Sequence, residues 1–284
     1  MTLNPCGFVF LNKEAGKTTF RSLSPLKRNV KKIAKAKVGH AGTLDSEATG
    51  LIIAAVGSAT RLLSYIEVQN KEYEFKLHLG FSTLTGEASG EVLEQKDSRH
   101  ITPEDVDAAL HQFRGKISQT PPLYSAVKID GKRASDRALA GENPTLKSRE
   151  VEIFSLEWKN KAEFVFKCHC SKGTYIRSLG RDIGKALGVP ACVSGIHRTK
   201  IGHISIEESQ KWDSEDFSLV EPAKLLEFPI IEVSNEDYLH IQNGRHCKAD
   251  VLNEQKYLVK YNGQTVALAL GQEDGLLKPK IVFQ

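Results

Sequence analysis

The sequence predicts an α+β fold, with a large mixed or antiparallel sheet followed by a small C-terminal β module of the barrel type. Strand-like and helix-like segments follow one another irregularly, and we find no internal repeat. Residues 230–284 contain short alternating segments, turns at Asn243 and Asn262 (each followed by Gly) and no clear helix. A chain of 284 residues suits one domain of about 200 residues with such an appendage. We therefore expect domains at 1–228 and 229–284.

Apolar runs and alternating patterns predict the strands of the large sheet. Residues 7–11 and 51–56 are continuous apolar runs of strand length, which is typical of buried strands. Residues 72–80 alternate, with Tyr73 on the apolar face and charged residues on the other, as in a half-buried strand. The remaining strands are expected at 151–156, 163–170, 191–196 and 200–206.

Helices are predicted by hydrophobic period and by capping residues. One apolar stripe predicts an amphipathic helix that Pro25 starts or kinks. Its members are Phe20, Leu23, Leu26, Val30 and Ile33. Ser58 is the expected N-cap of a second helix, and Thr102 begins a capping box before a third. A fourth helix is expected to open at Gly173 and to close at Gly188.

The distribution of charge is more informative than the net charge of +4. Residues 15–44 hold eight Lys or Arg and no Asp or Glu, whereas acidic residues gather at 207–237. A basic zone attracts phosphates, and this attraction usually dominates affinity for nucleic acids. Lys31 and Lys32 lie in this zone, and we interpret them as polyanion contacts. A solvated helix face is the alternative.

Cysteine count and hydropathy restrict the compartment. Five scattered cysteines, an odd number, do not form a disulfide framework. No apolar run approaches the ~18 residues that a membrane helix needs, and the N-terminus lacks a signal-peptide pattern. We therefore expect a reduced, cytoplasmic protein without a membrane segment.

Two short motifs do not carry the chemistry that they suggest. The Gly-Lys-Thr run at 16–18 would be a P-loop only if Leu11 were glycine. The Cys-His-Cys run at 168–170 lies on a predicted strand, where neighbouring residues point to opposite faces, and no second pair lies at ligand spacing. We interpret it as buried thiols and expect neither a metal nor a cofactor.

The segment 39–50 (GHAGTLDSEATG) combines flexibility with chemistry. Its three glycines allow a tight turn and close approach to a ligand. His40 and Asp45 are its candidates for chemistry, and the basic zone precedes it. A lone Asp beside Gly is more often a turn residue, so the wider sequence must decide the role of Asp45.

The wider sequence resembles a known family. HAGTLD at 40–45 and ATGL at 48–51 are closely similar to the signature of the TruB-type pseudouridine synthases, the bacterial tRNA pseudouridine(55) synthases. Further similar pieces occur in the family's order, at 71–73, 113–117, 119–128, 168–177 and 277–283. The resemblance covers nearly the whole chain. It implies a pseudouridine synthase catalytic domain and a C-terminal PUA-like RNA-binding module.

The chain departs from the family pattern at a few positions. Ser46 and Glu14 stand where the family usually has prolines that stiffen loops. Residues 82–87 lack the aspartates that usually follow this strand, and Ser135 replaces a usual tyrosine in the RNA-contacting insertion at about 124–150. The departures concern loop rigidity and RNA contact rather than the signature itself.

The resemblance implies an active site without metal or cofactor. Isomerising uridine cuts the N1–C1′ bond and rejoins the base through C5, so nothing is oxidised or added. Asp45 is then the catalytic carboxylate, and Arg177 pairs with it and keeps it ionised. Tyr73 would stack on the uracil and could assist proton removal at C5. Attack at C1′, attack at C6 and a glycal route remain open.

The resemblance also implies how RNA is held. The target base must be flipped out of its stack before it can react. His40 would hold the RNA open, and the other contacts are expected from Tyr175, Ile196, Lys31, Lys32, Lys128 and Arg133. For Ile196, ordinary core packing is the alternative, and for His40 it is an ordinary turn histidine. The expected partner is the T-stem-loop of tRNA, bound by a monomer.

Two other functions compete with this one. A non-catalytic RNA-binding protein or tRNA chaperone could use the same scaffold, but it could lose any of Asp45, Arg177 and Tyr73, all of which are present. A metal-dependent nuclease would need clustered carboxylates, and the central motifs offer only Asp45.

Overall fold

The computed structural model describes residues 5–142 and 144–283. The chain forms two compact units. The first comprises residues 1–46, 50–68 and 203–284, and the second comprises residues 47–49 and 69–202. Helices and strands in both units confirm the α+β class. The boundary at residue 228 stays a prediction.

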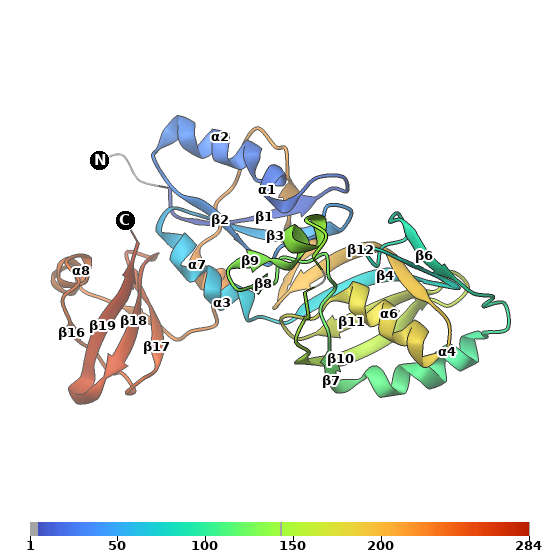
Figure 1. The fold of residues 1–284 in the computed structure, drawn as a ribbon. Coiled ribbons are helices and arrows are strands. Elements are labelled where there is room, and N and C mark those ends of the chain that lie inside the picture. Colours follow the sequence, from blue (N-terminus) through green and yellow to red (C-terminus); the bar gives the residue numbers. More distant parts are fainter. Residues whose placement is uncertain (1–4, 143, 284) are drawn as a thin grey trace. The chain divides into compact units, whose positions relative to one another are not determined.

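Four strands of the first unit form a mixed arrangement (Figure 1). β1 (Gly7–Lys13) pairs antiparallel with β3 (Thr49–Val56) and parallel with β14 (Gln210–Lys211), and β2 (Val38–Ala41) pairs antiparallel with β3. β1 and β3 are buried almost throughout, as their apolar runs predict. The 39–50 segment therefore begins in β2 rather than in the predicted loop.

The basic region contains two helices instead of the one predicted. α1 (Thr19–Ser22) ends just before α2 (Ser24–Ile33), and Pro25 lies in the first turn of α2, so it starts this helix rather than kinking it. Of the predicted stripe, the three central residues are buried, but Phe20 and Ile33 are 66% and 70% exposed. The helices are too short for the whole stripe to face the core.

The helix predicted from Ser58 begins differently. A 3₁₀ helix, η1 (Gly57–Leu62), leads into α3 (Leu63–Glu67), and neither has a side-chain cap. The Ser58 hydroxyl lies 3.1 Å from the Cys6 thiol, so it is engaged elsewhere. The cap prediction was therefore wrong, although the segment is helical.

The C-terminal part of the first unit is a separate five-stranded sheet in the order β15-β17-β18-β19-β16. Its strands are β15 (Ile230–Glu232), β16 (Cys247–Lys248), β17 (Lys256–Tyr261), β18 (Gln264–Gln272) and β19 (Leu276–Val282). Asn262 adopts a positive φ in the β17–β18 turn, as an Asn-Gly hairpin requires. This sheet has its own core around Tyr257, Val259 and Leu277.

The prediction that residues 230–284 contain no helix was wrong. α8 (Asn235–Gln242) begins at Ser234, whose hydroxyl accepts a hydrogen bond from the Asp237 amide at 3.1 Å. Asn243 ends this helix and is not a hairpin turn. Only Ile241 of the helix is buried, so its sequence carries almost no apolar period.

The second unit is built on an antiparallel sheet in the order β12-β4-β11-β10-β7 (Figure 1). The strands are β4 (Lys71–Leu79), β7 (Gly115–Gln119), β10 (Arg149–Asn160), β11 (Val165–Cys170) and β12 (Ala191–Ile201). β12 runs through the gap between the predicted strands 191–196 and 200–206, and the second of these continues in a separate short strand, β13 (Ile204–Ser205). Register shifts within β12 interrupt the alternation, and Gly195 has a φ of +60°. The break in the pattern is therefore a bulge and not a loop.

Helix α6 (Ile176–Ala186) lies on one face of this sheet with α4 (Pro103–Leu110) beside it (Figure 1). Its approach to β12 requires glycine, because a Cβ at Gly180 or Gly184 would lie 2.3 Å from a β12 side chain. α4 has the predicted capping box at Thr102. α6 begins at Ile176, three residues after the predicted start at Gly173, and Gly188 follows its end with a φ of +72°.

The stretch 128–150, predicted to be loop-like, contains regular structure. β8 (Lys128–Ile129) and β9 (Lys132–Arg133) form a hairpin, and α5 (Ala134–Leu139) follows it. The hairpin turns through Asp130 and Gly131, both at positive φ. The other elements are β5 (Phe81–Thr83), β6 (Val92–Gln95), η2 (His111–Phe113), β13 (Ile204–Ser205), η3 (Ile206–Glu208), α7 (Pro222–Leu225) and η4 (Glu273–Gly275).

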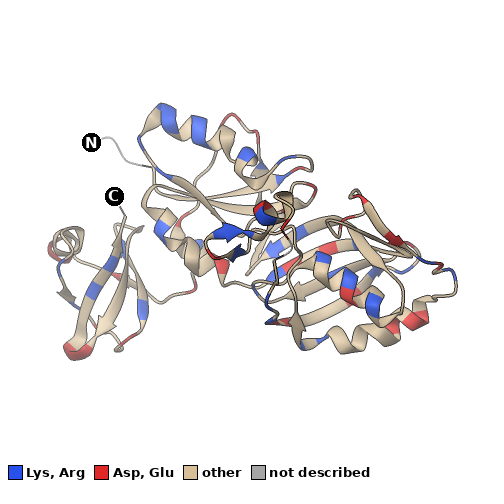
Figure 2. Ribbon diagram, viewed as in Figure 1, with Lys and Arg blue, Asp and Glu red and all other residues tan. Residues whose placement is uncertain are grey.

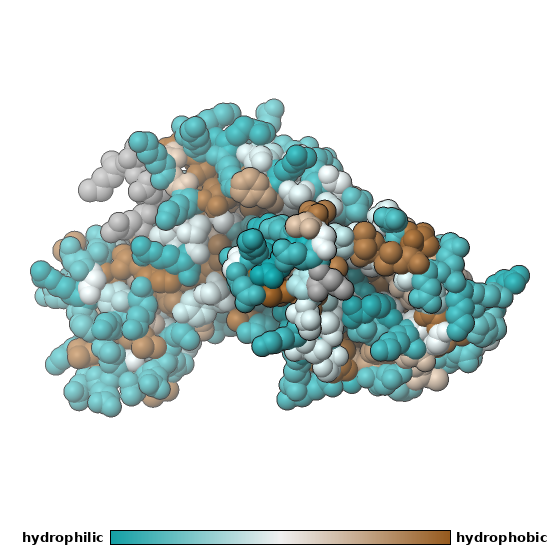
Figure 3. Space-filling model, in the orientation of Figure 1, coloured by the Kyte–Doolittle hydropathy of each residue, from teal (hydrophilic) through white to brown (hydrophobic). Residues whose placement is uncertain are grey.

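No helix among the described residues is long and apolar enough to cross a membrane. The cysteines Cys6, Cys168, Cys170, Cys192 and Cys247 are all free. The surface over α2 is mainly hydrophilic (Figure 3).

Candidate active site

The 39–50 segment, whose residues 39–46 belong to the first unit, is held by a reciprocal hydrogen-bond pair next to Asp45. The hydroxyl of Thr19 donates to the Leu44 carbonyl at 2.8 Å and accepts from the Leu44 amide at 2.9 Å. Both residues are buried, with exposures of 1% for Thr19 and 5% for Leu44. The backbone on the N-terminal side of Asp45 is therefore fixed to α1, and the half-buried carboxylate follows directly.

A buried lysine fixes the other side of Asp45. Lys13, at the end of β1, is 0% exposed, and its ammonium donates to the Ser46 carbonyl at 2.8 Å and to the Glu14 carbonyl at 3.0 Å. Charge-assisted hydrogen bonds of this kind are among the stronger ones in proteins. Lys13 was not predicted, because nothing in the sequence separates it from an ordinary strand end.

His40 lies on β2 opposite Ala54 and is half-buried. Its Nε2 is 3.3 Å from the hydroxyl of Thr43, which lies on the same turn. The imidazole is thus oriented by the segment that also carries Asp45.

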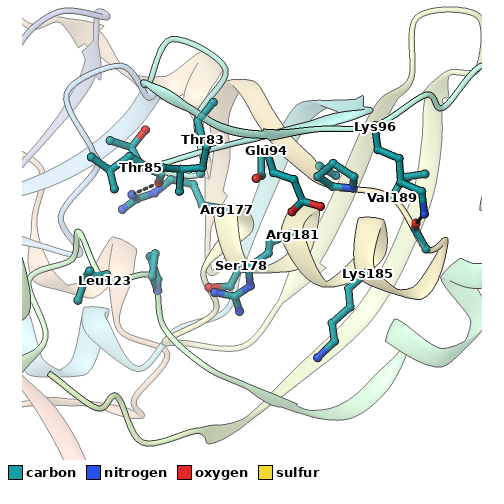
Figure 4. Close-up of a pocket in the computed structure, with 18 residues that line it drawn as sticks. Thr83, Thr85, Glu94, Lys96, Leu123, Arg177, Ser178, Arg181, Lys185 and Val189 are labelled. Carbon is teal, nitrogen blue, oxygen red and sulfur yellow. Dashed lines mark hydrogen bonds between the residues drawn. The ribbon is translucent and has the colours of Figure 1, made fainter. Parts of the chain in front are cut away.

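In the second unit, Arg177 is a buried candidate residue whose guanidinium is fixed by hydrogen bonds. It is 4% exposed, and its guanidinium donates to the Thr85 carbonyl at 2.7 Å and to the Tyr124 carbonyl at 2.9 Å. Figure 4 shows it reaching from α6 toward Thr85. Arg177 also lines a cavity of about 620 Å³ together with Arg181, Lys185 and residues 82–86. The guanidinium is held in one orientation from two loops.

A carboxylate that the sequence did not predict lies beside this arginine. Glu87 is 8% exposed, and its Oε1 is 3.6 Å from the Arg177 Nε. The sequence shows that residues 82–87 lack the usual aspartates. A glutamate is nevertheless present at the end of that stretch, which is the signal that could have identified it.

Glu87 and Ile196 line the same small cavity. Its volume is about 160 Å³, and Ala48, from the end of the 39–50 segment, also contributes to it. Ile196 is 6% exposed. It therefore forms part of a cavity wall beside the carboxylate that faces Arg177, in addition to its packing in β12.

Tyr73 lies in the middle of β4, directly opposite Arg198 on β12 and Cys168 on β11. Burial raises the pKa of the Tyr73 phenol, and a hydrogen bond with the Arg198 guanidinium partly offsets this. Arg198 itself is 1% exposed. The phenol is therefore neutral near pH 7, and sequence reasoning did not predict the buried arginine beside it.

Tyr175 is fixed through its backbone. Its amide donates to the Gln119 side chain at 2.8 Å, and its carbonyl accepts from the same side chain at 3.1 Å. This pair places Tyr175 at the start of α6, two residues before Arg177.

The 168–170 run holds buried thiols, as the sequence predicts. Cys168 and Cys170 are 0% exposed, and His169 packs on the other face against Phe154 at 4.9 Å between ring centroids. Within the described part of the chain, no group of three or more His, Cys, Asp or Glu side chains could hold a metal ion.

Comparison with known proteins identifies the family. The sequence pattern of the TruB family pseudouridylate synthase (N terminal domain) matches residues 28–176. The tRNA pseudouridine synthase B of Streptococcus mutans serotype c is 34% identical over 98% of this chain and 99% of its own length. That of Carboxydothermus hydrogenoformans is 37% identical over 98% of both chains. This chain belongs to the TruB family of pseudouridylate synthases.

Solved structures support the TruB fold. An H/ACA RNP bound to a substrate RNA containing 2′-deoxyuridine includes a chain that matches with a TM-score of 0.68 at 19% identity. A Cbf5-Nop10-Gar1 complex gives 0.66 at 21% identity. Each match covers 98% of this chain and 85% of that chain. At these identities the likeness concerns the fold alone.

The structure distributes the predicted TruB site residues over both units. His40, Asp45, Lys31 and Lys32 belong to the first unit, and Tyr73, Lys128, Arg133, Tyr175, Arg177 and Ile196 belong to the second. The predicted pairing of Asp45 with Arg177 stays a prediction. Within the second unit, Arg177 has Glu87 and two carbonyls as partners.

The four basic residues among the predicted RNA contacts of the TruB chain are exposed. Lys31 and Lys32 lie in the last turn of α2, and Figure 2 shows basic residues along this helix. Lys128 and Arg133 are directly opposite each other in the β8–β9 hairpin. Like charges in this arrangement destabilise a sheet, so their presence favours a role in binding an anion.

Proposed function

We propose that this chain isomerises uridine to pseudouridine at position 55, in the T-loop of tRNA. The observation that carries the proposal is the match, over 98% of this chain, to relatives named tRNA pseudouridine synthase B. The signature that contains Asp45 lies within the matched family region. We also infer that the enzyme acts as a monomer in the cytoplasm.

Asp45 is the residue that we propose to act on the nucleotide. Hydrogen bonds to the backbone of Leu44 and Ser46, its two neighbours, support this role because they fix the main chain that carries the carboxylate. Holding a reacting group in place removes part of the entropic barrier. We propose that Arg177 pairs with Asp45 and keeps it ionised. Glu87 and two carbonyls would hold Arg177 in position for this task.

For Tyr73, we propose stacking on the flipped uracil as the main role. A phenol whose pKa is raised by burial stays protonated near neutral pH, so it is a poor general base. The planar ring meanwhile offers contact area to a base. Tyr175 and Ile196 would complete the walls of the base site, and His40 would hold the RNA open.

Basic residues of both units would contact the RNA backbone. Lys31 and Lys32 on α2, and Lys128 and Arg133 in the hairpin, supply exposed cations for the phosphates of the T-stem and loop. The five-stranded C-terminal sheet, with its own core, is a candidate PUA-like RNA-binding module.

One experiment tests the catalytic proposal. The purified chain is incubated with a T-arm stem-loop RNA labelled with tritium at uridine C5, and tritium release is measured. Wild type should release tritium, and Asp45→Asn should not. Asp213→Asn, which changes a carboxylate outside the signature, is the matched control and should retain activity. RNA binding without tritium release by wild type would instead support a non-catalytic RNA-binding protein or tRNA chaperone.

A second experiment tests the basic helix. Lys31→Ala with Lys32→Ala should lower the affinity for the T-arm RNA and flatten its dependence on salt. Each lost phosphate contact should reduce the slope of log affinity against log salt by about 0.7 to 0.9. The control replaces Lys159 and Lys161 with Ala, because both already form ion pairs with protein carboxylates. An unchanged slope in the Lys31 and Lys32 variant would exclude a phosphate role there.

A further inference from the structure

Arg149, the first residue of β10, makes contacts that the proposed mechanism does not use. The carbon of its guanidinium lies 4.7 Å from the centroid of the Tyr175 ring. An arginine over an aromatic face is attracted by the ring and still presents its N–H groups at the edge of the guanidinium plane. Arg149 thus contacts Tyr175, the residue that we expect to form a wall of the base site.

One edge of this guanidinium has no protein acceptor. Among the described residues, none accepts a hydrogen bond from the Nε or Nη2 of Arg149, and both atoms are shielded from solvent. In Arg99 the same two atoms hold the Asp97 carboxylate, each at 3.0 Å. The Nε and Nη2 edge is therefore a geometry that takes an anion in bidentate fashion. Buried polar groups are normally hydrogen-bonded, so a buried donor pair of this kind points to an acceptor from outside the chain.

The surroundings fix Arg149 and Tyr175 as one unit. Arg149 is directly opposite Gln119 in the β10–β7 pairing, and Gln119 holds the Tyr175 backbone from both sides. Gly173, at a φ of +80°, passes close to the same guanidinium, where an added Cβ would lie 3.4 Å from Nη1. Three elements therefore determine where the open edge lies relative to the Tyr175 ring.

We propose that Arg149 binds a backbone phosphate of the substrate RNA, next to the uridine that is isomerised. The inference rests on the proposed function and adds a positioning residue to it. Phosphates are the anionic groups of RNA, and their oxygens match the spacing of the Nε and Nη2 donors. Since Arg149 covers one face of Tyr175, the flipped base would use the rest of that ring.

The chain that leads into Arg149 is irregular. Residues 144–148, which lead into Arg149, form neither helix nor strand. An arginine that only supported the Tyr175 ring would need the stacking contact alone. The alternative role is thus purely structural, and it predicts no dependence on any single phosphate of the RNA.

The test combines protein variants with a phosphate scan. T-arm RNAs carry one neutral methylphosphonate at a time, on a 2′-deoxy nucleotide, across the phosphates around the target uridine. The reference RNAs have the same 2′-deoxy nucleotide with a natural phosphate. Binding is measured in the Asp45→Asn background, so that the RNA is not converted. The variants are Arg149→Gln and Arg149→Lys, and Arg99→Gln is the control.

Arg149→Gln should weaken binding of the natural RNA by at least about tenfold, which corresponds to roughly 1.4 kcal/mol. At one phosphate, the methylphosphonate should weaken RNA binding by the protein that keeps Arg149 by a similar factor. The same methylphosphonate should hardly weaken binding by Arg149→Gln, because that variant has already lost the contact. Arg149→Lys should lose part of the affinity, because lysine keeps the positive charge but lacks the paired Nε and Nη2 donors. If the free-energy losses from the Arg149→Gln change and from the methylphosphonate are additive at every phosphate, the proposal is overturned.

The two proposals fail in different ways. If the phosphate coupling is present but wild type releases no tritium, the proposed isomerase function is wrong and Arg149 still binds RNA. If wild type releases tritium and the losses add at every phosphate, only the role of Arg149 is wrong. Should Arg149→Gln fail to fold, as judged by circular dichroism, the scan with Arg149→Lys gives the same decision.

Discussion

The buried ammonium of Lys13 offers the sharpest test of how Asp45 is held. Lys13→Met keeps the length and apolar stem of the side chain but removes its hydrogen bonds to the carbonyls of Ser46 and Glu14. Asp45 immediately precedes Ser46, so the variant releases one of the two anchors of the catalytic candidate. The other anchor, the Thr19 clamp on Leu44, remains.

Opposing terms determine the size of the stability change. Each hydrogen bond from a charged donor contributes about 1.5–3 kcal/mol. Methionine avoids the cost of burying an ammonium, which is several kcal/mol. Because the two effects largely cancel, we expect the free energy of unfolding to fall by only about 1–2 kcal/mol.

The effect on catalysis should be larger than the effect on stability. A displacement of about 1 Å at a reacting group can cost on the order of 100-fold in rate. We therefore expect the single-turnover rate of tritium release to fall by about tenfold to 100-fold, with RNA affinity nearly unchanged. Urea unfolding and a filter-binding titration complete the measurement.

Lys17→Met is the matched control. Lys17 lies in the turn that follows β1, and its ammonium pairs with the Glu14 carboxylate at the surface, at 3.3 Å. Exposed pairs contribute about 0–1 kcal/mol, and this one holds no backbone group next to Asp45 by a hydrogen bond that the described residues show. An unchanged rate in Lys13→Met, together with the expected loss of stability, would refute the reasoning, because Lys13 would then support only the fold.

Two further predictions concern the second unit. Gly184→Ala should destabilise the protein by about 1–3 kcal/mol in urea unfolding, because the new Cβ would lie 2.3 Å from the Ala191 Cβ. A stability equal to wild type would contradict the close contact between α6 and β12. Asp107 accepts hydrogen bonds from Trp158 and a lysine, which hold its carboxyl pKa below the usual value. Its stabilising effect is therefore present above the unfolded pKa and is lost as pH falls through the lower folded pKa. The stability difference between wild type and Asp107→Asn should accordingly shrink in acid, and a constant difference would contradict this.

The strands that the sequence predicted best are those whose burial produces a regular pattern of apolar residues along the chain. β1 and β3 are buried nearly throughout, and β4 alternates, so each pattern follows directly from the faces that the strand buries. The failures have the opposite cause. α8 buries only Ile241 and has no apolar period to detect, and the bulges of β12 interrupt its alternation.

The candidate site shows a similar division. Asp45 and Arg177 could be predicted because they occur in long motifs. Lys13 and Arg198 could not, because their roles depend on contacts with residues far along the chain, whereas the one sequence signal for Glu87 was its place at the end of residues 82–87. Arg198, for example, is 125 positions from Tyr73 in the sequence (198 minus 73) but faces it across two paired strands. Such partners are determined by strand register, which no local pattern specifies.

The serine beside the catalytic candidate leads to a last prediction. Ser46 stands where the TruB family usually has proline, yet its carbonyl, which proline also has, is the group that Lys13 holds. The exposed Ser46 side chain makes no hydrogen bond that the structure assigns among its described residues. Ser46→Pro should therefore keep the anchor while restricting the unfolded chain, and it should raise the free energy of unfolding by about 0.4–1 kcal/mol.

The rate of tritium release should not change in Ser46→Pro, because the Lys13 and Thr19 anchors already fix the backbone on both sides of Asp45. Urea unfolding and single-turnover kinetics measure the two quantities on the same preparation. Ser46→Ala is the control, because it removes the hydroxyl without restricting the chain. A rise in rate with proline but not with alanine would show that the anchors leave Asp45 mobile. The rigidity of the segment would then depend on the residue at 46 and not on the buried lysine.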